Sequence, residues 1–86
     1  MQYASPLVAK ATAVRDAVRY AISRGIGKAN IETDALAVVK AVESNLNDVQ
    51  WEIRAIIDDI HSSIREAWGQ VFNIQHIPRT ANQVAD

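Results

Sequence analysis

Two acidic residues and one histidine stand where a folded chain could use them for chemistry. Asp34 follows a short strand-like run, His76 lies near the end of a second such run, and Asp86 is the last residue. Carboxylates held rigidly by a strand end or a first helical turn can bind Mg²⁺, which prefers oxygen ligands. A histidine beside them can move a proton at neutral pH. Each signal is weak alone, because an aspartate before a helix is more often a cap than a ligand.

A long amphipathic helix is expected at the start of the chain. Ser5 is a good N-cap and Pro6 suits the first helical position, whereas Arg24-Gly25 is a typical helix end. The apolar residues between them recur at steps of three and four, as one buried face of a helix requires. They are Leu7, Ala11, Val14, Val18, Ala21 and Ile22.

The rest of the chain alternates between strand and helix patterns. We predict a strand over 28–33, a helix over 35–43, a loop over 44–48, a helix from 51 to near 68–69, a strand over 71–77 and a helix beginning at 80 or 81. In the second helix Leu36, Val39 and Val42 are expected on one side, and in the last strand Phe72 and Ile74 are expected on one face. This order is typical of an α/β domain with neighbouring parallel strands.

Length and composition indicate one globular domain over residues 1–86. The chain has 49% hydrophobic and 22% charged residues, no cysteine and a formal net charge of -1. Disulfides and thiolate metal sites are therefore excluded, and the strongly basic composition of many nucleic-acid binders is absent. No signal peptide or apolar stretch of membrane-spanning length is present, so we expect an intracellular protein in an unknown compartment.

Several spaced motifs resemble the type-1 ribonuclease H-like domain, in the form found in plant genomes and reverse-transcriptase-derived proteins. The matching segments are Pro6-Leu7-Val8-Ala9, Gly25-Ile26, Ile31-Glu32-Thr33-Asp34 and, most specifically, the stretch from His76 to Asp86. The resemblance implies the C-terminal part of that fold, with N-terminal strands expected before Met1 and the last helix cut short. Two strands alone make a poor core, so an exposed sheet edge is expected, with marginal stability or self-association as its consequence.

The resemblance also implies a chemistry, in which four carboxylates hold two Mg²⁺ ions that cleave the RNA strand of an RNA–DNA hybrid. Asp34 and Asp86 match two metal ligands, and His76 matches an auxiliary catalytic histidine. Asn82 and Arg79 are the residues expected to contact the substrate, Arg79 through a phosphate.

Lys10 is the main departure from the family pattern. It stands between Ala9 and Ala11, where the family has a glutamate, and a lysine cannot bind Mg²⁺. Asp16 lies six residues on, about 120° around the helix and about 9 Å along it, and cannot substitute. The family's first aspartate would precede Met1, so two of four ligands are expected. Lys10 itself is expected to be a solvated surface lysine.

Other conspicuous side chains have ordinary structural interpretations. Trp51 and Trp68 are expected in or beside the core, and His61 on the surface. The arginines of the first helix are expected to form a solvated face together with Asp16. They are Arg15, Arg19 and Arg24.

Two functions follow from these observations. The first is nucleic-acid binding with Mg²⁺-dependent hydrolysis of RNA–DNA hybrids, impaired in this chain. The second is a non-catalytic module that binds nucleic acid or protein, or a decayed remnant of a mobile element, for which Lys10 is the distinguishing feature.

Overall fold

The computed structural model describes residues 5–78, which form three α-helices, one short 3₁₀ helix and two strands. In chain order the elements are α1 (Pro6–Ser23), β1 (Lys28–Thr33), α2 (Leu36–Glu43), η1 (Leu46–Asp48), α3 (Trp51–Glu66) and β2 (Val71–His76). The predicted order of elements is therefore confirmed, and the first strand has the predicted bounds. The last helix predicted from the sequence lies outside the described residues.

The boundaries of α1 are set by the residues that the sequence indicated. The Ser5 hydroxyl accepts a hydrogen bond from the Val8 amide at 3.1 Å, which satisfies one of the donors left open at a helix start. At the other end Gly25 has a φ of 67°, a conformation that suits glycine. The Ile26 amide then donates to the Ala21 carbonyl at 3.0 Å and closes the helix end.

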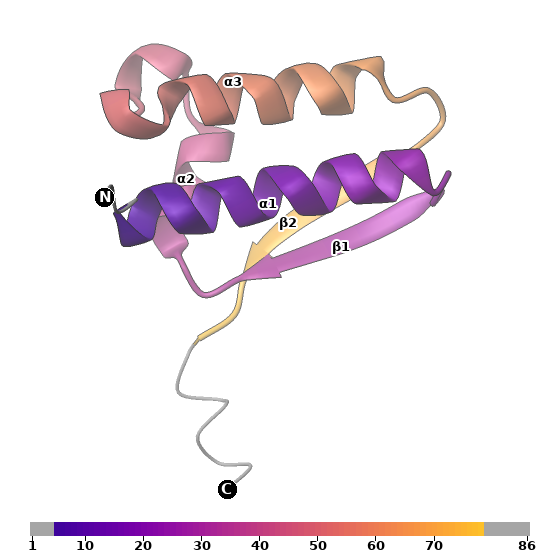
Figure 1. The fold of residues 1–86 in the computed structure, drawn as a ribbon, viewed down its shortest axis with the longest axis horizontal. Coiled ribbons are helices and arrows are strands. Elements are labelled where there is room, and N and C mark those ends of the chain that lie inside the picture. Colours follow the sequence, from indigo (N-terminus) through magenta and orange to yellow (C-terminus); the bar gives the residue numbers. More distant parts are fainter. Residues whose placement is uncertain (1–4, 79–86) are drawn as a thin grey trace, which may run out of the picture.

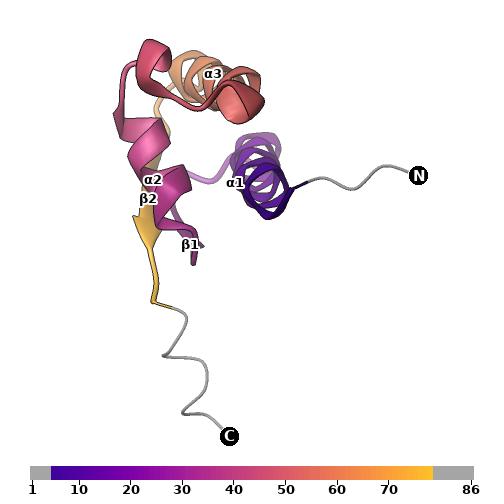
Figure 2. The ribbon, with the colours of Figure 1, turned by 90° about the vertical axis from the view of Figure 1, so that its left-hand side faces the viewer.

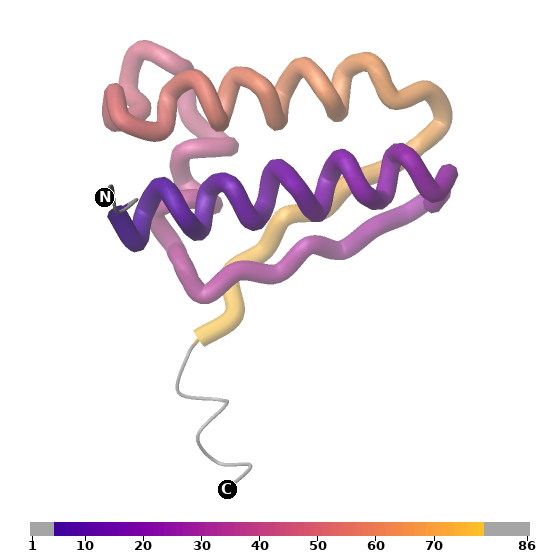
Figure 3. Tube along the Cα trace, viewed as in Figure 1, coloured from indigo at the N-terminus to yellow at the C-terminus, as the bar shows by residue number. Residues whose placement is uncertain are grey.

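The two strands are parallel neighbours, as predicted. Their register runs from Lys28 opposite Val71 to Thr33 opposite His76. The chain contains two helix–strand units, α1 followed by β1 and α3 followed by β2. In both units the helix runs in one direction and the strand runs back in the other (Figure 1, Figure 3). The carboxyl ends of both strands therefore lie at the end of the molecule where α1 begins.

The helices cover one face of the sheet. Viewed end-on, α1 and α3 lie side by side, with α2 next to β2 (Figure 2). Ile31 on β1 is buried and Phe72 and Ile74 on β2 are half-buried against the same core. Asn30 and Asn73 on the other face are exposed, and the half-buried Phe72 and Ile74 share one face of β2 as predicted.

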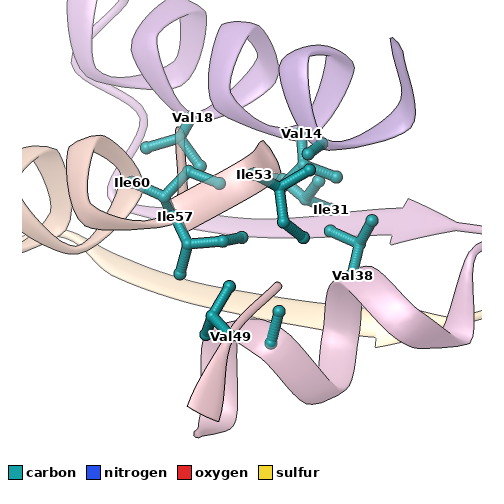
Figure 4. Packing of buried hydrophobic residues seen from close by; sticks show 10 residues of the cluster. Val14, Val18, Ile31, Val38, Val49, Ile53, Ile57 and Ile60 are labelled. Carbon is teal, nitrogen blue, oxygen red and sulfur yellow. The ribbon is translucent and has the colours of Figure 1, made fainter. Parts of the chain in front are cut away.

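The core is built mainly from branched aliphatic side chains of α1 and α3. Ile53, Ile57 and Ile60 of α3 are at most 1% exposed and meet Val14 and Val18 of α1 (Figure 4). Val38 of α2, Val49 and Ile31 complete the contact. The buried face of α1 includes four of its six predicted positions, and Leu7 and Ile22 are partly buried beside it.

The two tryptophans were expected in or beside the core, and this expectation is wrong. Trp51 is 83% exposed and Trp68 is 95% exposed. Trp51 opens α3 about 200° around the helix from Ile53, so it faces away from the core. Trp68 follows the end of α3, next to the turn at Gly69, where none of the elements described for residues 5–78 covers it.

Leu36 opens α2 and is 45% exposed, whereas the buried positions of this helix are Val38, Val39 and Ala41. One smaller expectation about the helices is also wrong. His61 is half-buried, not exposed: its Nε2 lies 2.7 Å from the Val42 carbonyl, to which it donates, and this bond ties α3 to α2. None of the helices in the described part of the chain could cross a membrane.

Replacing Ile57 by alanine tests the position of the core. Ile57 is fully buried, so the loss of its side chain should cost about 2–5 kcal/mol, comparable with the whole stability of a domain this small. Chemical denaturation followed by circular dichroism measures this, with Trp68→Ala as the control. Trp68→Ala should change the unfolding free energy by less than about 0.5 kcal/mol. Equal losses in the two variants would show that the core is placed wrongly.

Candidate functional site

The candidate site lies at the carboxyl ends of the two parallel strands, the edge of an α/β sheet where ligands usually bind. Asp34 directly follows β1, and His76, which is exposed, ends β2 opposite Thr33. The Ile77 amide donates to the Thr33 carbonyl at 2.9 Å and keeps the strands paired up to this point. The structure therefore brings two of the predicted site residues to the same edge.

Asp34 does not occupy the cap position of α2. That position belongs to Ala35, whose amide donates to the Thr33 hydroxyl at 3.2 Å. The turn after β1 is thus held by Thr33, whereas the Asp34 carboxylate contacts a different element of the fold.

α1 supplies the contact that defines the site. The Lys10 Nζ atom donates to Oδ1 of Asp34 at 2.6 Å, although the two residues are 24 positions apart. Their side chains are 35% and 30% exposed, so the ion pair is partly shielded from water. The expectation that Lys10 is merely solvated is wrong, because its ammonium group is bonded to the carboxylate at the strand end.

Two open hollows adjoin this ion pair and share Glu32, Thr33 and Asp34 in their walls. The first, of about 240 Å³, lies between α1 and β1 and is also lined by Lys10, Ala13, Val14, Ala17 and Ile31. The second, of about 300 Å³, is completed by Ile77. The lining of the first hollow thus combines apolar side chains of α1 and β1 with the charges of Lys10, Glu32 and Asp34.

This arrangement agrees with a comparison against known protein families. The family described as reverse transcriptase-like matches residues 1–86. The chain belongs to this reverse transcriptase-like family of ribonuclease H-like domains. Three helices and two parallel strands are consistent with a partial ribonuclease H-like fold. No curated protein and no solved structure matches the chain.

The described residues do not fit the metal site expected for a ribonuclease H-like chain. Within residues 5–78 no three histidine, cysteine, aspartate or glutamate side chains come together to hold a metal ion. A Mg²⁺ ion on Asp34 would also lie beside the Lys10 ammonium, and the two like charges would repel. Asp16 is no substitute, since its exposed side chain contacts Arg15 instead. The other predicted site residues, Arg79, Asn82 and Asp86, lie outside the described residues.

The arginines of α1 are engaged differently from the solvated face that was expected. Arg15 and Arg19 both reach Asp59 on α3, Arg15 with its Nη1 atom at 3.9 Å from Oδ2. Arg15 also approaches Asp16, at 3.4 Å. Arg24 lies over the Tyr20 ring, 5.7 Å from its centroid. These arginines mainly connect α1 to α3 and to its own last turn, away from the strand ends.

Sequence reasoning missed the contact between Lys10 and Asp34, although a signal for it was present. According to the resemblance, Lys10 stands at the position of a family carboxylate that shares metal ions with the residue matched by Asp34. If the side chains at positions 10 and 34 meet at one site, the opposite charges of Lys10 and Asp34 predict an ion pair between them. Glu32 was also overlooked as a charged wall of the site, because it was treated only as part of the strand.

The contribution of the ion pair to stability can be measured with Lys10→Met, which keeps the length of the side chain but removes its charge. We expect the unfolding free energy to fall by about 0.5–1 kcal/mol, since the pair is only partly buried. The matched control is Lys28→Met, because Lys28 is exposed and forms no ion pair within residues 5–78. A Lys10→Met variant as stable as the Lys28→Met control at low salt would contradict the ion pair.

Proposed function

We infer that the chain is a nucleic-acid-binding module of the ribonuclease H-like type that acts on RNA–DNA hybrids and whose Mg²⁺-dependent hydrolysis is impaired. The observation that carries this proposal is the Lys10–Asp34 ion pair at the carboxyl end of β1. It places a positive charge at the point where the hydrolytic chemistry needs a divalent ion held by carboxylates.

Binding of nucleic acid is supported by the family and by the location of the site. Members of a ribonuclease H-like family are related to nucleic-acid processing, and the hollows at the strand ends are open to solvent-borne ligands. In this proposal Arg79 contacts a phosphate, Asn82 contacts the hybrid, and His76 is an auxiliary catalytic residue. Asp34 and Asp86 are the carboxylates that would hold Mg²⁺, which would activate water for attack on the phosphodiester.

Hydrolysis by this chain should be no more than a trace. The test incubates the protein with a labelled RNA–DNA hybrid in excess Mg²⁺ and follows the RNA strand by gel electrophoresis. The expected outcome is a cleavage rate close to that of the buffer, unchanged in Asp34→Asn. Robust cleavage that disappears in Asp34→Asn would show that Asp34 holds a working metal site despite Lys10.

A second candidate is a non-catalytic module that binds protein. It is favoured by the net charge of -1 and by Trp51 and Trp68, whose exposed rings resemble the aromatic anchors of protein interfaces.

A salt titration separates the two candidates. If the chain binds a hybrid through its backbone, the association constant should fall as salt rises, with a slope that counts the phosphates neutralised. This slope is measured by fluorescence anisotropy of a labelled hybrid at salt concentrations from about 25 to about 200 mM. No binding at the lowest salt would remove the nucleic-acid proposal and leave the protein-binding module.

A further inference from the structure

We propose that Lys10 is a resident cation of the site: its ammonium group bridges Asp34 and a phosphodiester oxygen, so that the chain binds a nucleic-acid backbone without a divalent metal. This inference rests on the proposed nucleic-acid binding and specifies how the strand-end site takes part in it. The ligand is defined by its chemistry, an anionic phosphodiester, and not by a base sequence.

The geometry of Lys10 leaves donors for such a ligand. A lysine ammonium carries three N–H donors. The bond to Oδ1 of Asp34, at 2.6 Å, uses one of them and holds the Nζ atom at the strand end. The side chain is 35% exposed and lines the 240 Å³ hollow, so the other donors are accessible from it.

The hollow has room for a phosphate group with bound water. Its volume is about 240 Å³, many times the space that one water molecule needs. Beside Lys10, α1 contributes Val14 and the small side chains of Ala13 and Ala17 to the lining.

The charge balance of the site also favours this role. Asp34 and Glu32 both line the hollow, and two carboxylates without a counter-ion would repel a phosphodiester. A bound divalent ion usually removes such repulsion. Here the Lys10 ammonium offsets the charge of Asp34 from within the chain, so that Glu32 alone contributes a net negative charge to the lining of the hollow, whatever the metal concentration.

The experiment compares hybrid binding with EDTA and with Mg²⁺ at matched ionic strength, by fluorescence anisotropy of a labelled RNA–DNA duplex. The variant is Lys10→Glu, and the matched control is Lys28→Glu, which makes the same change of charge at an exposed position away from the hollow. Wild type should bind equally well, within about twofold, in both buffers. Lys10→Glu should bind about tenfold more weakly in EDTA, the size of one lost charged contact.

Mg²⁺ should restore most of that loss in Lys10→Glu, because the introduced carboxylate and Asp34 together can hold the ion that replaces the ammonium group. Lys28→Glu should show a loss of less than about threefold, with no recovery by Mg²⁺. A purely structural role for Lys10 does not produce such a recovery in binding. Circular dichroism establishes that each variant is folded, and Lys10→Gln serves in place of Lys10→Glu if the latter unfolds; it should lose affinity without recovery by Mg²⁺.

Two results would overturn the inference while leaving the proposed function intact. One is wild-type binding that requires Mg²⁺, and the other is a Lys10→Glu or Lys10→Gln affinity in EDTA no weaker than that of Lys28→Glu. Absence of hybrid binding by every variant in both buffers is a different outcome, which overturns the proposed nucleic-acid function and this inference with it.

Discussion

The packing of α1 against β1 and α3 is the constraint on which both the core and the candidate site depend. Ala11 and Val18 are fully buried and Val14 is nearly so, and these three positions fix the axis of α1 over the sheet. Lys10 directly precedes Ala11, so the same packing fixes where the lysine side chain leaves the helix. Closely packed protein cores tolerate little displacement of their helices. The contact between Lys10 and Asp34 therefore depends on how α1 packs in the core.

The parallel connection imposes the second constraint. Each strand runs in the direction opposite to the helix that precedes it. The start of α1 and the carboxyl ends of β1 and β2 therefore lie toward the same end of the molecule. A sheet of two strands gives little apolar area by itself. The isoleucines of α3 therefore supply much of the buried apolar surface, and the core depends on the contacts that orient α3. Asp59 with the α1 arginines and His61 with the Val42 carbonyl hold that helix from two sides.

Local features were predictable from the sequence because their causes are local. Ser5, Pro6 and Gly25 determine the ends of α1 through hydrogen bonds and backbone conformation within a few residues, and the alternation at Phe72 and Ile74 follows from the geometry of a strand. The family could also be inferred, since its motifs are short and ordered.

Contacts between elements were not predictable in the same way. The exposure of Trp51 follows from helix geometry, since Trp51 lies about 200° around α3 from Ile53, but it was missed because large apolar rings are usually buried. The bond of His61 to a carbonyl of α2 needs the crossing of two helices. For Lys10, the resemblance to the family supplied an expected position but not the partner, because Lys10 was considered only as a missing ligand and not as a positive charge beside Asp34. Its ammonium group offsets the negative charge of Asp34 without a metal ion. A site of this kind is therefore better judged by its charges and contacts than by the number of carboxylates it retains.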